Sequence, residues 1–480
     1  MACVVCLASL YVQGRSLLPL ATLDLSGFSL SARKLKVLLS SLPSVETLRC
    51  GPQVCKDACL PVLLDFLQRL KVGGAGGVPS IFLKTLKFAK CDLGEAAVVI
   101  FHHLPRSLEY LDLSGNRLRS VSMEGLGSVL SFAWLPSLLS LDLSDNPLGS
   151  SGVKTFARGL SSSPQSLPLQ TLKLARTKAK AEGVQALAEA LKAKKTTSLQ
   201  TLDLAENEMR PAGLKHLASA VNAEAVPHLR VLVLKENELT KVTDQEKDCA
   251  PISELLTTNA LKGLQEFDLS DNCLFDEGVG EIGGGGGGVQ LSAATVAVPG
   301  RFPKLRRLDL GRVSPSIICS EQLAAFAGAL GVGGLPSLEE LVIPFGGSEQ
   351  NPNPQGVVSL ANALTSGHLS QLRGLTLPSR DDVTDEAFAS LTRSLVTGKT
   401  SLLQTVNLEI RNINSAEGLG ALAGGIRGGR FCALTSFRLC LGDHIPESGH
   451  ALSSLGLAFG SGGCTAVHAE APSEMAGGRG

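Results

Sequence analysis

Two pairs of cysteines in the sequence have spacings that metal chemistry uses. Cys3 and Cys6, and likewise Cys55 and Cys59, are separated as thiolate ligands of zinc often are. The residues between Cys3 and Cys6 are apolar, and no pair of histidines lies near either motif in the sequence. Small buried thiols in a reducing compartment are the more common role of such cysteines, so we expect no metal site.

A glycine motif, Gly278-x-Gly280-x-x-Gly283, has the spacing of a dinucleotide-binding turn. Such a turn needs a strand before it and a helix that begins at its third glycine. Here Gly283 instead opens a run of six glycines, residues 283–288. No Gly-x-x-x-x-Gly-Lys-Ser/Thr phosphate loop occurs in the sequence. We therefore expect no bound cofactor.

Acidic residues recur at equivalent places, and two of them, Asp112 and Asp142, would lie about 5 Å apart on neighbouring strands. Paired carboxylates can perform acid–base chemistry, but an open surface gives them no site from which water is excluded. The eight histidines fall on expected helices or connections, away from any serine or cysteine nucleophile on a strand. We expect no catalytic residues and no enzyme.

A repeat determines the elements that position these residues. The pattern Leu-x-x-Leu-x-Leu-x-x-Asn-x-Leu starts at Leu108 and Leu138, and three near-identical copies start at Leu199, Leu229 and Leu264. With looser copies there are about fourteen units. The second strand leucine recurs every 30 or 31 residues, at Leu111, Leu141, Leu172, Leu202 and Leu232.

Each unit predicts a short strand, with inward leucines alternating with outward polar residues, followed by an amphipathic helix. One unit cannot bury both its strand leucines and its helix stripe, whereas stacked units form a continuous core. Helices are about 10 Å wide and strands about 4.8 Å apart, so the stack must curve. The fold class expected is therefore α/β, a right-handed leucine-rich-repeat solenoid (horseshoe). Its parallel sheet lines the concave face, and its helices cover the convex face.

The asparagine of the pattern turns the chain after each strand, and its amide can bond the backbone of adjacent turns. Cys91 and Thr177 replace it in two repeats, where we expect a weaker hydrogen-bonding group to substitute in part. Residues 1–19 are interpreted as a partial repeat or cap helix, residues 20–457 as the solenoid and residues 458–480 as a disordered tail. The glycine-rich segments 73–77 and 283–288 are interpreted as flexible loops on the rim.

From this pattern we expect the chain to start within a repeat. Two alternatives are open: an unusual cap, or a fragment of a longer receptor or scaffold. Its apolar N-terminal run, residues 2–12, lacks the basic flank and the small-residue cleavage site of a signal peptide. We therefore expect a cytoplasmic protein.

The unit length, the helix in every repeat and the Leu-x-x-Leu-x-Leu-x-x-Asn/Cys pattern resemble the ribonuclease-inhibitor-like class of leucine-rich repeats. That class includes the sensor arrays of NOD-like receptors and the GTPase-activating protein of Ran, and the resemblance covers about residues 17–445. It implies a non-enzymatic module that binds a protein, as a scaffold or sensing array. A Ran-type GTPase-activating protein and an enzyme inhibitor remain alternatives, although the tail is not acidic and Trp134 is the only tryptophan.

Strand alternation predicts which side chains face the hollow. Six aspartates in the central row indicate an acidic stripe, which a basic surface of a partner protein would complement. Alternatively, Leu-Asp-Leu-Ser is a framework motif whose aspartates bond across the strands. Tyr110 is the best single anchor. The candidate partner-binding residues are Tyr110, Asp112, Asp142, Lys173, Asp203, Asp268 and Asp309.

Composition limits the partners. Lys and Arg together number 44, as do Asp and Glu, so no long-range positive field attracts nucleic acid or an anionic membrane. Aromatic residues are 4% of the chain, too few for base-stacking platforms. No uncharged apolar run reaches the roughly 20 residues that span a bilayer. We expect neither nucleic acid nor membrane as a partner.

Overall fold

A computed structural model describes most of the chain and divides it into two compact units, residues 1–231 and 232–480. The described residues are 20–40, 42, 45–56, 58–72, 83–242, 248–272, 297–311, 320–344, 355–411, 416–441 and 449–460. The expected cap (residues 1–19), both glycine-rich loops and the Gly278 motif lie outside them. So do Cys3, Cys6 and residues 461–480 of the expected tail.

The first unit alternates short strands with helices. Its strands are β1 (Leu20–Asp24), β2 (Val45–Arg49), β3 (Thr85–Lys87), β4 (Tyr110–Asp112), β5 (Ser140–Asp142), β6 (Thr171–Lys173) and β7 (Thr201–Asp203). Its helices are α2 (Ala32–Ser40), α3 (Cys59–Val72), α4 (Ala96–Phe101), α5 (Ser120–Ser131), α6 (Gly149–Ser161), α7 (Lys180–Lys192) and α8 (Arg210–Asn222). The boundary between the units falls within β8 (Val231–Val233).

The second unit continues the same alternation. Its strands are β9 (Glu266–Asp268), β10 (Arg307–Asp309), β11 (Glu340–Val342), β12 (Gly374–Asp382), β13 (Thr405–Arg411) and β14 (Ser436–Leu441). Its helices are α9 (Ala250–Thr257), α10 (Ser320–Gly331), α11 (Gln355–Ser366), α12 (Asp385–Thr397), α13 (Ala416–Arg427) and α14 (Gly449–Gly460). Helix α14 ends at Gly460, so it includes the first three residues of the segment expected to be a disordered tail.

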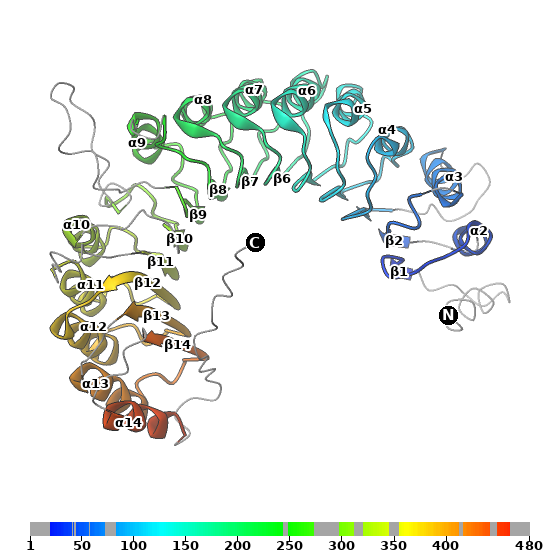
Figure 1. Ribbon diagram of the computed structural model, residues 1–480. Coiled ribbons are helices and arrows are strands. Elements are labelled where there is room, and N and C mark those ends of the chain that lie inside the picture. Colours follow the sequence, from blue (N-terminus) through cyan, green and yellow to red (C-terminus); the bar gives the residue numbers. More distant parts are fainter. Residues whose placement is uncertain are drawn as a thin grey trace, which may run out of the picture. The chain divides into compact units, whose positions relative to one another are not determined.

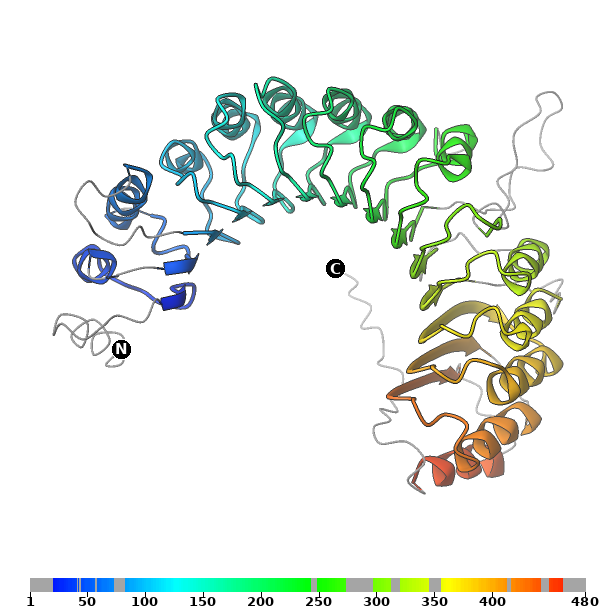
Figure 2. The same cartoon turned by 180° about the vertical axis from the view of Figure 1, so that it is seen from behind.

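In each unit the strands are parallel and ordered as in the sequence. The strands lie on one side of each unit, the strand face, and the helices lie on the other side, the helix face (Figures 1 and 2). The expected solenoid of strand–helix repeats is confirmed. Its core lies between the two layers, where strand leucines such as Leu111 and Leu141 are buried against the apolar side of each helix, such as Val153, Phe156 and Leu160 of α6.

The repeat asparagines hold successive turns together. Asn146 is fully buried, and its Oδ1 accepts hydrogen bonds from the N–H groups of Asn116 (2.8 Å) and Leu118 (3.0 Å). Its Nδ2 donates to the carbonyl oxygens of Leu113 and Leu143, both at 2.9 Å. Each such amide therefore joins its own turn to the turn of the preceding repeat.

Thr177 and Cys91 partly replace this bonding, as expected. The Thr177 hydroxyl lies 2.9 Å from the Leu174 carbonyl oxygen and 2.8 Å from Oδ1 of Asn207. The Cys91 thiol donates to the Cys50 carbonyl oxygen at 3.2 Å.

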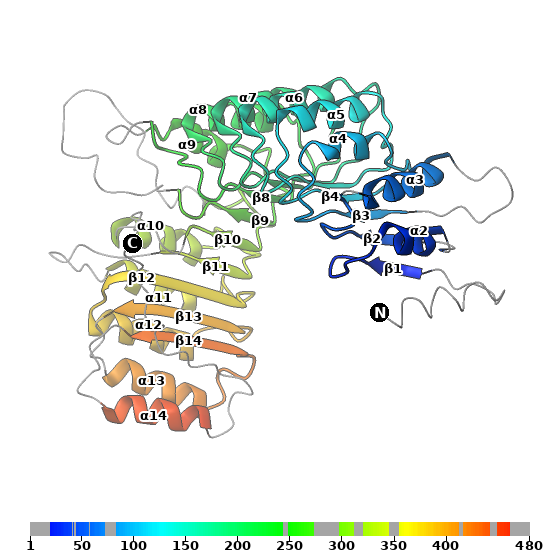
Figure 3. The ribbon, with the colours of Figure 1, turned by 45° about the vertical axis from the view of Figure 1, so that its right-hand side comes forward.

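The strands β12, β13 and β14 are longer, with nine, seven and six residues (Figure 3). In β12 and β13, Arg380 and Arg411 stand where the asparagine would be and lie within the strand itself. The missing asparagine alone does not explain the extra length, because β3 and β6 lack it too and have three residues each.

Candidate functional site

The register of β1 to β7 aligns two rows of side chains on the strand face of the first unit. The hydroxyl row precedes the buried leucine of each strand, and every member carries a hydroxyl group. It consists of Thr22, Thr47, Thr85, Tyr110, Ser140, Thr171 and Thr201. The charged row follows the same leucine and consists of Asp24, Arg49, Lys87, Asp112, Asp142, Lys173 and Asp203.

The charged row corrects the expected acidic stripe. Sequence reasoning missed Arg49, although the Val45-x-x-Leu48 spacing of its repeat was there to find. Four aspartates and three cations give the row a formal charge of −1. The row is thus mixed in charge, with the adjacent cations Arg49 and Lys87 beside the adjacent acids Asp112 and Asp142.

Asp112 and Asp142 of the row accept hydrogen bonds from within their own turns. Oδ1 of Asp112 accepts from the N–H (3.0 Å) and the hydroxyl (2.7 Å) of Ser114. Oδ1 of Asp142 accepts from the Ser144 N–H at 2.9 Å. These bonds support the framework role, but they leave Oδ2 of both carboxylates available to a partner.

In the second unit, the two aspartates that were predicted to bind a partner differ in accessibility. Asp268 is half-buried and bonds Ser270 as Asp112 bonds Ser114. Asp309 is only 4% exposed, whereas a residue that binds a partner must be accessible to it. Its carboxylate lies 3.4 Å from Nη2 of Arg307 and accepts from the Gly311 N–H at 3.1 Å. This burial argues against the predicted contact of Asp309 with a partner, which stays a prediction.

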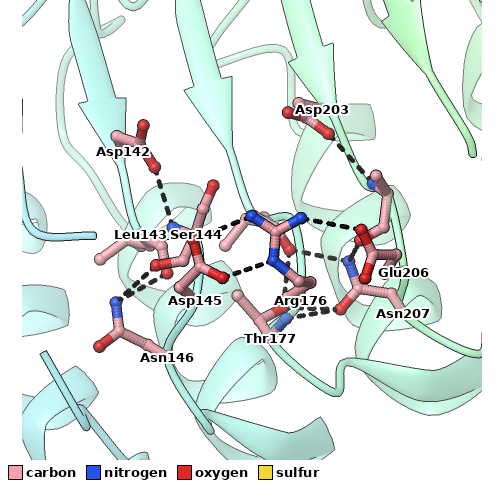
Figure 4. Close-up of polar contacts among 12 residues, drawn as sticks. Asp142, Leu143, Ser144, Asp145, Asn146, Arg176, Thr177, Asp203, Glu206 and Asn207 are labelled. Carbon is pink, nitrogen blue, oxygen red and sulfur yellow. Dashed lines mark hydrogen bonds and ion pairs between the residues drawn. The ribbon is translucent and has the colours of Figure 1, made fainter. Parts of the chain in front are cut away.

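Charged side chains next to this face form a ladder at the turns. Arg176 lies between Asp145 and Glu206 of the neighbouring repeats (Figure 4). Its Nη2 donates to Oδ2 of Asp145 at 3.0 Å and its Nη1 to Oε1 of Glu206 at 2.8 Å. All three residues have a positive φ, between 54° and 59°. Hydrogen bonds from Arg176 hold the pKa of Asp145 below its usual range.

Asp203 is an acid of the charged row whose pKa is raised. Burial raises the pKa of its carboxyl above the ordinary value of 3.8, although the Ala205 N–H and the Lys173 ammonium act in the opposite direction. The folded state therefore holds this proton more tightly than the unfolded state does. The contribution of Asp203 to stability is lost as pH rises from 3.8 through the higher folded-state pKa.

We expect Asp203→Asn to be more stable than the wild type near neutral pH, because the amide oxygen still accepts from Ala205 and carries no charge to bury. The advantage should shrink as pH falls below the carboxyl pKa. Urea unfolding over a pH series measures it. A difference that stays the same at every pH would contradict the burial effect.

A shallow groove occupies the strand face at β1 to β4. Its volume is about 350 Å³, and it is lined by Thr22, Thr47, Arg49, Thr85, Lys87 and Tyr110. Tyr110 is 44% exposed, so its ring is accessible. The groove thus brings one of the predicted partner residues together with two cations, neither of which was predicted as a binding residue.

The helix face carries a different kind of exposed surface. Phe132 and Trp134, just after α5, are 69% and 37% exposed, with ring centroids 6.2 Å apart. The Trp134 ring also meets the ring of His102 after α4, edge to face at 6.1 Å. Phe132 and Trp134 together are called the aromatic patch, and both residues lie outside the strands.

The described residues offer little for metal or cofactor chemistry. No group of three or more His, Cys, Asp and Glu side chains among them is arranged to hold a metal ion. Cys55 and Cys59 are buried, as expected, and the thiol of Cys59 donates to the Leu30 carbonyl oxygen at 3.3 Å. Hydrogen bonding with Cys50 raises the pKa of Cys55, which keeps this thiol protonated.

The tripeptide Gly398-Lys399-Thr400 matches the last three residues of a phosphate-binding loop. It follows the C-terminal end of α12, however, where helix carbonyl groups repel anions. In the described part of the chain, every helix is too short or too polar to cross a membrane.

Comparison with known proteins supports this architecture. A profile described as Leucine Rich repeat matches residues 135–157, 195–218 and 264–283. A second profile, described as Leucine Rich Repeat, matches residues 107–129. The chain carries leucine-rich repeats. These segments include β4, β5 and β7, which carry members of both rows, and β9 of the second unit.

Among solved structures, the chain is similar to a leucine-rich-repeat protein of Leptospira interrogans. The two are 15% identical, over 94% of this chain and 95% of that one, with a TM-score of 0.40. Among curated proteins, none matches the sequence.

Proposed function

We propose that this chain is a non-enzymatic protein-binding module, a scaffold or sensing array, which holds its partner on the strand face of residues 20–231. Leucine-rich repeats generally mediate binding between proteins. The subclass resemblance to ribonuclease-inhibitor-like repeats, and a cytoplasmic location, are parts of the same proposal.

The observation that carries the proposal is the composition of this face. Its two rows offer hydroxyl groups and charges of both signs on strands whose turns are fixed by buried asparagine amides. Rigid polar groups lose little conformational entropy on binding, which favours recognition of a protein surface. Tyr110 is the one aromatic member of the rows, and exposed tyrosines often dominate binding energy at interfaces.

The test is affinity capture from native lysate with the full chain as bait. We expect Tyr110→Ala to weaken retention of the partner by about 30-fold, because truncating an anchor costs about 2 kcal/mol. Replacing Asp112 and Asp142 by Asn should weaken it further, since each carboxylate keeps one oxygen for a partner.

The matched control lies on the helix face. A bait with Phe132→Ala and Trp134→Ala removes a larger exposed aromatic area than Tyr110→Ala does, from residues outside the strands. We expect this bait to keep the partner. Loss of the partner from the control, with retention by the Tyr110 variant, would place binding on the aromatic patch and overturn the proposal.

A further inference from the structure

The groove at β1 to β4 contains a pair of adjacent cations that internal partners neutralise only in part. Arg49 and Lys87 are register neighbours on β2 and β3, so their backbones are about 4.8 Å apart. Arg49 has one ion-pair partner, Asp24 at 3.4 Å, and both of these side chains are more than 40% exposed. Within the described residues Lys87 has no ion pair, although Asp112 is its register neighbour on β4.

The nearby acids do not occupy the space between the two cations. Oδ1 of Asp24 is held by the N–H (2.9 Å) and hydroxyl (2.6 Å) of Ser26, and Oδ1 of Asp112 is held by Ser114 in the same way. In the next row of charges, Lys84 pairs with Glu46 (3.4 Å) and Glu109 (3.8 Å), so the charge of Lys84 is already neutralised within that row. A carboxylate from outside would therefore reduce the repulsion between Arg49 and Lys87.

The hydroxyl row supplies hydrogen-bonding groups next to the two cations. Thr47 and Thr85 are register partners, and both line the groove together with Thr22 and Tyr110. Hydroxyl groups both donate and accept, so they can satisfy a carboxylate as well as the amide groups of a peptide backbone. The groove volume of about 350 Å³ accommodates a side chain and its flanking backbone.

The acids that follow in the charged row identify the remainder of the ligand. Asp112 and Asp142 lie on β4 and β5, directly after the cations of β2 and β3. A polyanion such as nucleic acid would be repelled there. A basic side chain would instead be attracted, because Oδ2 of each carboxylate remains available.

Strand spacing sets the distance between the two attractive points. The centre of the β2–β3 cation pair and the centre of the β4–β5 acid pair are two strand spacings apart, about 10 Å. A peptide in the extended polyproline II conformation advances about 3.1 Å per residue and completes a turn in three residues, so side chains three residues apart point the same way and lie about 9 Å apart.

We propose that the groove binds an extended peptide segment of the partner protein, in which an acidic residue is followed three residues later by Lys or Arg. The acidic residue lies between Arg49 and Lys87, and the basic residue meets Asp112 and Asp142. This inference rests on the proposed function and names the chemistry of the partner.

The experiment measures the anisotropy of fluorescent synthetic peptides on titration with the full chain. The probes are uncharged Ser/Gly/Ala peptides that carry Glu-x-x-Lys, Glu-x-x-Glu, Lys-x-x-Lys or a Glu–Lys pair at twice that spacing. We expect Glu-x-x-Lys to bind about tenfold more tightly than each of the others at low salt, and the preference to fade at higher salt. Equal binding of all four peptides, or no binding by any, would overturn the inference.

Charge reversal provides the second arm. Lys87→Glu should shift the preference from Glu-x-x-Lys to Lys-x-x-Lys, whereas a variant that fails to fold would bind neither. Lys178→Glu is the matched control, because this exposed lysine lies in the turn before α7, outside both rows. If Lys87→Glu leaves the preference unchanged while Tyr110→Ala still loses the captured partner, this inference fails and the proposed function stands.

Discussion

Asn146→Ala should lower the free energy of unfolding by about 3 kcal/mol or more, because leaving several buried backbone groups unsatisfied costs about 1–3 kcal/mol for each. The amide is fully buried and bonds five backbone groups in two successive turns. Alanine removes those bonds and leaves the N–H groups of Asn116 and Leu118 without that acceptor.

The control for this prediction is Arg176→Ala in the neighbouring turn. Arg176 makes two ion pairs, but its side chain is 48% exposed, and exposed ion pairs contribute at most about 1 kcal/mol. Urea unfolding followed by circular dichroism compares the two variants with the wild type. If Arg176→Ala were the more damaging change, the buried asparagines would not be the main connection between turns.

Gly159→Ala should destabilise the protein by about 2–3 kcal/mol, the cost of forcing extra volume into a packed core. A Cβ atom at this position of α6 would lie 2.4 Å from the Cα of Gly127 in α5 and 2.8 Å from its carbonyl oxygen. Both obstacles are backbone atoms, so the two helices would have to move apart. Thermal unfolding of the purified chain measures the effect.

Gly328→Ala in α10 is the matched helical control. A Cβ atom there meets nothing within 4 Å. Alanine restricts the unfolded chain and favours the helix, so this variant should gain about 0.5–1 kcal/mol. Equal losses from both substitutions would indicate a general intolerance of alanine, and not a close approach of α5 and α6.

Much of the fold followed from the sequence, because repeat position determines burial. Strand leucines, helix stripes and buried asparagines recur with the period of the unit, so one copy such as Leu108–Leu118 predicts the others. The longer strands β12 and β13 could not be predicted in this way, because β3 and β6 also lack the asparagine and have only three residues each.

The candidate site was less predictable, because its character depends on neighbours in register. Asp309 has the same local sequence position as Asp268, yet Arg307 and the Gly311 turn occupy its carboxylate and it is buried. Arg49 and Lys87 are 38 residues apart in the sequence, and only the pairing of β2 with β3 makes them neighbours. The exposure of Tyr110 could be predicted from strand alternation alone, because it depends only on which face of β4 the side chain is on.

The most direct test of the strand face as the binding surface is site-specific photocross-linking. A photoreactive amino acid replaces Tyr110 on β4 in one variant and Phe132 after α5 in a second, and each is irradiated in native lysate. We expect a partner protein to be joined covalently through position 110 and not through position 132. A partner joined through position 132 alone would contradict it and assign binding to the aromatic patch on the helix face.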